Sequence, residues 1–109
     1  RSSYIFELKA AGYGIQGDKY TASREYIQIK ASVSGEGEII NCETVYQKET
    51  ENVGDACASE SFYSQFNGKT ESTAGEIDGI AGATITTKAY KDAISAMFSA
   101  LNTLKGGAN

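Results

Sequence analysis

A periodic run of apolar residues near the end of the chain strongly limits the folds that the chain can adopt. From about Thr86, large apolar side chains recur at intervals of four, three, four and three residues, at Tyr90, Ile94, Met97, Leu101 and Leu104. This spacing places them on one face of an α-helix, and Ala93 and Phe98 widen the stripe. Gly106 and Gly107 are stop signals for such a helix. The pattern predicts one long amphipathic helix that must pack its apolar face on another element.

Three earlier segments have the residue patterns of β-strands. Residues 26–33 alternate between apolar and polar side chains, while residues 4–11 and 39–46 are rich in β-branched and aromatic residues. Gly35 and Gly37 lie between the second and third segments and predict a hairpin turn. The strands are expected to form an antiparallel meander whose apolar face receives the long helix.

A shorter helix is expected within residues 56–66, because Phe62 and Phe66 are four residues apart. Asp55 is its expected N-cap, and Gly68 follows as a stop signal. The fold class predicted from these elements is α+β, with a small antiparallel sheet packed against a long C-terminal helix and a shorter helix.

The polar connector at residues 69–76 is expected to include a short strand around Glu76 and Ile77. No internal repeat or change of composition divides the chain. Its 109 residues fit one domain spanning residues 1–109.

Composition argues against several classes of function. The chain has no His, which removes the usual general base near neutral pH and the commonest zinc ligand. Its formal net charge of −4 is spread along the sequence, and no cluster of Lys and Arg could follow a nucleic-acid backbone. Apolar stretches reach only about five residues, against the roughly 20 that span a bilayer. We therefore expect no nucleic-acid partner and no membrane segment, and any signal peptide or anchor would lie outside this sequence.

The two cysteines, Cys42 and Cys57, leave two alternatives open. They could form a disulfide, which would contribute about 3 kcal/mol for a loop of this size in the chain-entropy model. They could equally be two buried free thiols. A short secreted chain favours the bridge and an intracellular chain favours the thiols. Two cysteines without His cannot form a metal site alone, so no metal is expected.

The residues best suited to chemistry lie at 78–88, where a glycine-containing turn opens into the long helix. The free amide groups and positive dipole of a helix N-terminus attract anions. Gly82 and Ala83 have little bulk to keep a phosphate away, and threonine hydroxyls follow at Thr84, Thr86 and Thr87. The alternative is that Thr84 or Thr86 simply caps the helix, worth about 1 kcal/mol, which is the commoner use of such residues.

This segment resembles the flavinylation motif of the FMN-binding domain family. In that motif an Asp, two residues, Ser or Thr, Gly, Ala and Thr precede a helix. Asp78, Gly82, Ala83 and Thr84 match it position by position, while Ala81 stands where Ser or Thr is usual. The motif makes Thr84 the counterpart of the residue that carries the flavin.

The resemblance extends over most of the chain in the family's order. Residues 4–14 look like the opening strand and glycine turn, and residues 47–54 look like the glutamate-threonine loop. Residues 62–69 resemble the phenylalanine, glycine and lysine segment that follows. The usual proline and first glycine after the Glu-Thr pair are replaced by Glu51 and Asn52.

The resemblance implies FMN bound covalently as a phosphoester on Thr84, with Asp78 needed by a separate flavin transferase. In the family this enzyme moves FMN from FAD onto the threonine and uses magnesium. No catalytic residue is implied, because the domain would relay electrons through its cofactor. The other implied cofactor-binding residues are Gly82, Ala83, Thr86, Thr87, Glu49 and Thr50. Tyr13 and Tyr46 could stack on the flavin or could be ordinary packing residues.

The family also implies a cellular context. Similar domains occur in one of the subunits of the sodium-pumping NADH:quinone oxidoreductase and in one of the subunits of the Rnf electron-transport complex. This implies redox partner proteins or a membrane redox complex, and a location on the extracytoplasmic face of a bacterial membrane or in a secreted protein or lipoprotein. Two alternatives remain open. The chain could be a flavin relay domain of a larger extracytoplasmic reductase, or a noncatalytic binding module whose threonine turn is only a helix cap.

Overall fold

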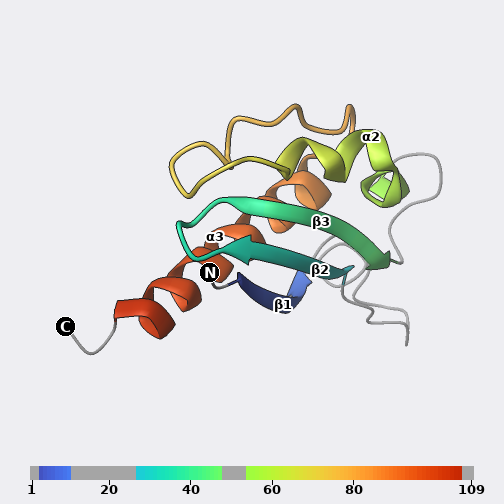
Figure 1. Ribbon diagram of the computed structural model, residues 1–109. Coiled ribbons are helices and arrows are strands. Elements are labelled where there is room, and N and C mark those ends of the chain that lie inside the picture. Colours follow the sequence, from blue (N-terminus) through green and yellow to red (C-terminus); the bar gives the residue numbers. More distant parts are fainter. Residues whose placement is uncertain (1–2, 11–26, 48–53, 107–109) are drawn as a thin grey trace.

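The computed structural model describes residues 3–10, 27–47 and 54–106, and these form a small α+β fold (Figure 1). The predicted fold class is confirmed. In chain order the elements are β1 (Ser3–Ala10), β2 (Ile27–Ser34), β3 (Ile39–Tyr46), the 3₁₀-helix η1 (Gly54–Ala58), α2 (Glu60–Tyr63), the 3₁₀-helix η2 (Ser64–Phe66) and α3 (Thr84–Gly106).

The three strands form the antiparallel meander β1-β2-β3 that their residue patterns predict. Residues that face each other include Glu7, Lys30 and Glu43, which align across all three strands. The β2–β3 turn needs a glycine at Gly37, because its φ of 88° is in the left-handed region. The amide of Gly37 donates to the carbonyl of Ser34 at 2.9 Å and closes the hairpin.

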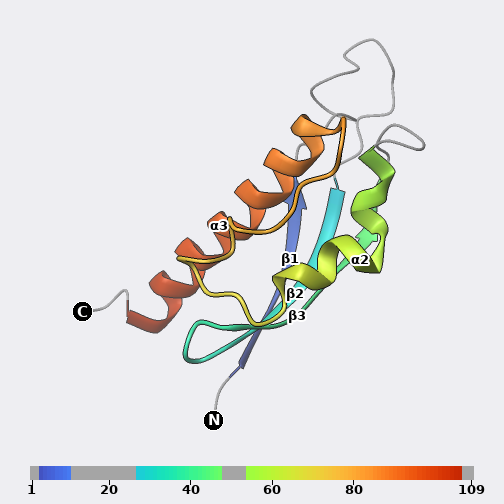
Figure 2. The same ribbon diagram turned by 90° about the horizontal axis from the view of Figure 1, so that it is seen from above.

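One face of the sheet is covered by helices. The long helix α3 contacts β1, whereas η1, α2 and η2 contact β3. Figure 2 shows this division, with α3 on the β1 side and α2 on the β3 side. The side chains of the central strand that point to this face are buried, and they are Ile27, Ile29, Ala31 and Val33.

Helix α3 ends at Gly106 as predicted and buries the predicted apolar stripe except at Leu104. The helix begins at Thr84 rather than Thr86, directly after the turn that precedes it. Leu104 is 63% exposed although it continues the periodic pattern. The physical reason is that the C-terminal end of α3 runs away from the strands (Figure 2).

The single helix predicted within residues 56–66 is instead three short pieces, η1, α2 and η2. Both Cys57 and Phe62 are buried. Five residues of continuous α-helix would turn their side chains about 140° apart. A break at Ser59 lets both face the core.

The prediction that Asp55 caps this helix is therefore wrong. Asp55 lies in the first turn of η1, and the N-cap of α2 is Ser59, which makes no side-chain capping bond.

The short strand predicted around Glu76 and Ile77 is also absent, since these residues have no regular secondary structure. The amide of Glu76 donates to the carbonyl of Thr73 at 3.0 Å within a tight turn. Such a turn bends the chain where a strand would have to be extended. Ile77 nevertheless points inward and is buried.

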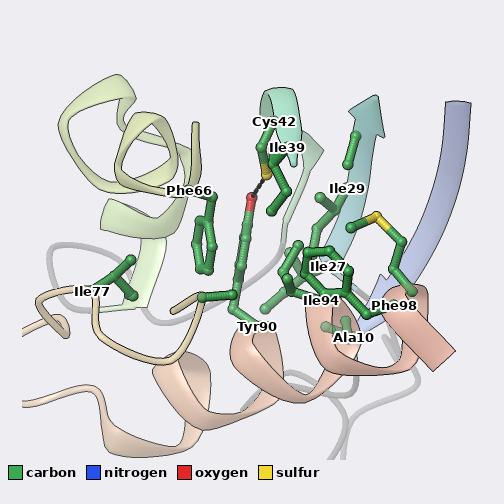
Figure 3. Packing of buried hydrophobic residues seen from close by; sticks show 14 of the residues in the cluster. Ala10, Ile27, Ile29, Ile39, Cys42, Phe66, Ile77, Tyr90, Ile94 and Phe98 are labelled. Carbon is green, nitrogen blue, oxygen red and sulfur yellow. Dashed lines mark hydrogen bonds between the residues drawn. The ribbon is translucent and has the colours of Figure 1, made fainter. Parts of the chain in front are cut away.

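The core is closed by an aromatic cluster that joins α3 to the short helices (Figure 3). The ring of Phe66 stacks on that of Tyr90 with centroids 5.4 Å apart, and Phe62 meets Tyr90 edge-on at 5.0 Å.

Within the part of the chain that the structure describes, no helix has the length and apolar character needed to cross a bilayer.

Candidate functional site

The candidate site is the turn that leads into α3. The amide of Ala83 donates to the carbonyl of Ile80 at 3.0 Å, which closes a turn over residues 80–83. Gly82 occupies the third position of this turn with a φ of 75°. A β-turn with positive φ at that position favours glycine. A methyl group added at Gly82 would meet no atom within 4 Å, so the requirement for glycine is conformational and not steric.

The cap position of α3 is held by Ala83. The first intrahelical hydrogen bond runs from the amide of Thr87 to the carbonyl of Ala83 at 3.0 Å, and the residue that accepts this bond is the N-cap. Thr84 is therefore the first helical residue and Thr86 the third. The helix-cap alternative for these two threonines does not fit, because neither of them stands at the cap.

The three threonines of the first turn have different environments. Thr84 is exposed, and its hydroxyl makes no hydrogen bond to any residue that the structure describes. Thr86 is 2% exposed and Thr87 is 9% exposed, so both are turned toward the interior. Thr84 is therefore the one exposed residue among these three threonines.

Thr87 uses its hydroxyl inside the protein. Its Oγ1 donates to the carbonyl of Ala83 at 2.9 Å and accepts the amide of Ile80 at 3.0 Å. Gly79 fits closely beside it, because an added Cβ would lie 3.2 Å from the Thr87 methyl carbon. These contacts tie the turn to the helix, a role that the residue pattern does not reveal.

Asp78 begins this segment, and its side chain is exposed. Its backbone is held by a residue that the sequence analysis did not identify, Gln65 of η2. The amide of Asp78 donates to Oε1 of Gln65 at 2.7 Å, and Nε2 of Gln65 donates to the carbonyl of Asp78 at 3.1 Å. The two residues are 13 positions apart, and no local pattern in the sequence could have paired them.

An open groove lies beside Asp78. It has a volume of about 380 Å³ and is lined by Ala56, Ser61, Phe62, Gln65 and residues 78–80. Ligand sites in proteins commonly span about 300–1,000 Å³. The groove joins the short helices to the turn before Thr84, so a group attached at that turn would have an adjacent surface with both apolar and polar walls.

A phosphate ester fits the start of α3. The amides of Thr84 and Ile85 precede the first intrahelical bond and therefore have no acceptor within the helix. The first turn contains no acidic residue, and Gly82 offers no side chain to obstruct an anion. The positive end of the helix dipole adds a favourable interaction with a negative group.

The two cysteines are buried thiols that are not joined in a disulfide, so the structure agrees with the second of the two alternatives. The hydroxyl of Tyr90 lies 3.8 Å from Sγ of Cys42 (Figure 3). It also lies 2.7 Å from Oγ1 of Thr44. Thr44 in turn donates to the carbonyl of Cys57 at 2.6 Å. These contacts form a largely buried polar network.

Burial dominates the electrostatics of this network. It raises the pKa of the Cys42 thiol from 9.0 to about 11, a shift that the hydrogen bond with Tyr90 partly offsets. The pKa of Tyr90 is also raised, first by burial and then by the neighbouring Cys42. Both groups are therefore protonated near neutral pH.

Some predicted site residues cannot be placed. Glu49, Thr50 and Tyr13 lie outside the described residues. Tyr46 ends β3 and is partly exposed. Of the remaining predicted residues, Asp78 lies two residues before the turn of residues 80–83. The others lie in this turn or in the first turn of α3, and they are Gly82, Ala83, Thr84, Thr86 and Thr87.

Comparison with known proteins agrees with the resemblance to the FMN-binding domain family. Residues 24–99 match the family model for the FMN-binding domain. No curated protein sequence matches the chain.

The solved structures that share the fold include two NqrC subunits. One is the NqrC subunit of the Na⁺-translocating NADH-quinone reductase from Parabacteroides distasonis, with 23% identity over 94% of this chain and 55% of that one, and a TM-score of 0.67. The other is NqrC from Shewanella oneidensis, with 17% identity over 95% of this chain and 52% of that one, and a TM-score of 0.71. The chain thus spans about half the length of each.

Proposed function

Because the chain belongs to the FMN-binding domain family, we propose that it carries FMN as a phosphoester on Thr84 and serves as an electron-transfer domain. The observation that supports this proposal most directly is the exposure of Thr84 at the first position of α3, while Thr86 and Thr87 are buried beside it. Only one of the three hydroxyls is open to an enzyme that would modify it.

Attachment would be a phosphoryl transfer by a separate flavin transferase. The Thr84 oxygen forms a bond to the flavin-side phosphorus of FAD, the pyrophosphate bond breaks, and AMP leaves. The hydroxyl proton is released, and no oxidation or reduction occurs. The resulting diester keeps one negative charge, which the N-terminus of α3 stabilises through its free amides and dipole.

The bound FMN would supply the redox chemistry. The chain's own contribution is to hold it. Covalent attachment prevents loss of the cofactor between oxidation states, and the groove lined by Phe62 and Gln65 offers a surface close to the attachment point. Glu49 and Thr50 are proposed as further contacts by their position in the family motif.

The proposed setting is a membrane redox complex on the extracytoplasmic side of a bacterial membrane. It is supported by the fold shared with the NqrC subunits of Na⁺-translocating NADH-quinone reductase. The free cysteines add no support for export. The alternative of a relay domain within a larger reductase uses the same site and differs only in the partner, which the parent gene would identify.

The test is to coexpress the chain with a flavin transferase and measure the intact mass. Wild-type protein should gain the mass of FMN less one water, and Thr84→Val should gain nothing. Thr103→Val is the matched control, because Thr103 is an exposed threonine on the same helix, and this variant should be modified normally. An unmodified wild type would favour a noncatalytic binding module, and a modified Thr84→Val would place the flavin elsewhere.

A further inference from the structure

We propose that Gln65 is a positioning residue for flavin attachment, because it fixes Asp78 relative to Thr84. The inference rests on the proposed function, since it concerns how the acceptor segment is presented to the transferase. Gln65 does not touch Thr84 in the contacts described above, and its role is to order the segment that contains Asp78.

The geometry of Gln65 is that of a side-chain clamp. Its amide group accepts from the Asp78 amide at 2.7 Å and donates to the Asp78 carbonyl at 3.1 Å. The same Nε2 also donates to the carbonyl of Phe62 at 3.1 Å. The primary amide therefore satisfies both backbone groups of Asp78 while remaining anchored to α2.

This clamp matters because it supplies the backbone hydrogen bonds at that end of the acceptor segment. Residues 77–79 make no backbone–backbone hydrogen bond to any residue that the structure describes. The other end of the segment is held by the Thr87 hydroxyl, which binds Ile80 and Ala83. The segment between Asp78 and Thr84 is thus fixed at two points, one on η2 and one on α3.

The clamp leaves the two residues that the transferase would engage, Asp78 and Thr84, exposed to solvent. The side chains of Asp78 and Thr84 are exposed, while the groups that hold their backbone lie on neighbouring elements. A transferase that must engage both residues at once would therefore find the distance between them fixed before it binds. If the clamp is lost, only a fraction of the molecules present this spacing, and the apparent affinity falls by that fraction.

The experiment measures flavin transfer kinetics and backbone order in the same variants. Gln65→Ala removes the clamp, and Gln65→Met removes its polar atoms while keeping a side chain of similar length in the groove. We expect both to raise the KM for the acceptor protein about tenfold, with kcat at saturation retained. Gln28→Ala is the matched control, because Gln28 is an exposed residue of β2. It should behave as wild type.

Amide hydrogen exchange of the flavin-free protein is the second measurement. Exchange at Asp78 should become faster in both Gln65 variants and should not change in Gln28→Ala. A purely structural role would lower thermal stability without this local change and without a selective rise in KM.

The outcomes separate the two proposals. If wild type takes up no flavin, the proposed function fails and this inference fails with it. If wild type is modified and both Gln65 variants match Gln28→Ala in KM, the inference alone is overturned. If Gln65→Met behaves as wild type while Gln65→Ala does not, packing and not hydrogen bonding is responsible, and the inference is again overturned.

Discussion

Single residues in this protein acquire their roles from burial as much as from chemical type. Thr84 and Thr87 have the same side chain and lie one helical turn apart, yet one hydroxyl is exposed and the other is bonded to Ile80 and Ala83. Cys42 shows the same effect in the core, since an ordinary thiol is made harder to ionise by its surroundings. Environment therefore separates a candidate attachment point from structural side chains.

The Cys42 thiol predicts a loss of stability in alkaline solution. In the unfolded chain this group ionises near pH 9, while in the folded protein it keeps its proton to about pH 11. The folded state binds more protons in this window, so the free energy of unfolding should fall as pH rises from 9 to 11. A shift of this size corresponds to about 3 kcal/mol at most.

Urea unfolding at a series of pH values would measure this loss. Cys42→Ala should be less stable than wild type at pH 8, because it leaves a cavity, but its stability should decline less steeply between pH 9 and 11. The remaining slope would report other groups, including Tyr90. Parallel curves for the two proteins would contradict the assignment to Cys42.

Among the elements, α3 and the turn before it are determined by different features of the sequence. The helix follows from apolar spacing, and its N-terminus is set by the turn that Gly82 permits. The segment from Gly54 to Phe66 depends instead on where the core lies, because Cys57 and Phe62 must both face it. The turn therefore controls where α3 begins and which threonine becomes its first residue.

Gly82→Ala tests the conformational requirement of this turn. Alanine should cost about 1 kcal/mol or somewhat more, because φ is positive there while the added methyl group meets no neighbour. Gly75→Ala is the control, since that site is equally open and is not among the glycines with positive φ. It should change stability by less than about 0.5 kcal/mol. Equal losses in chemical denaturation would show that the left-handed conformation is not the cause.

At the scale of the whole molecule, one core connects the sheet, α3 and the short helices. Phe66 and Tyr90 stack between elements that are far apart in the sequence, and the buried side chains form a single cluster with β2 at its centre. The described elements are therefore expected to unfold together, as small domains with one core usually do.

Phe66→Ala tests this cooperativity. Loss of the ring should lower the free energy of unfolding by about 3–5 kcal/mol while leaving a single transition. Far-UV circular dichroism and tyrosine fluorescence should give the same midpoint, because the sheet and the helices share this core. Val45→Ala, at an exposed site of β3, should have a much smaller effect. Separate midpoints for the two probes would show that the short helices unfold on their own.

Local periodicity and short motifs were enough to predict several features of the fold from the amino-acid sequence. These are the three strands, their antiparallel order, the long helix, and the turn in which Asp78, Gly82 and Thr84 match the family pattern. A repeat of two or 3.6 residues identifies a strand or helix because each element must bury one face.

Features that depend on distant contacts became visible in the folded molecule. The fold divided residues 54–66 into short helices, buried Thr86 and Thr87, left the two cysteines as thiols and paired Gln65 with Asp78. Each of these features depends on which residues come into contact across the core or across 13 or more positions of the chain. A local sequence pattern does not specify such contacts.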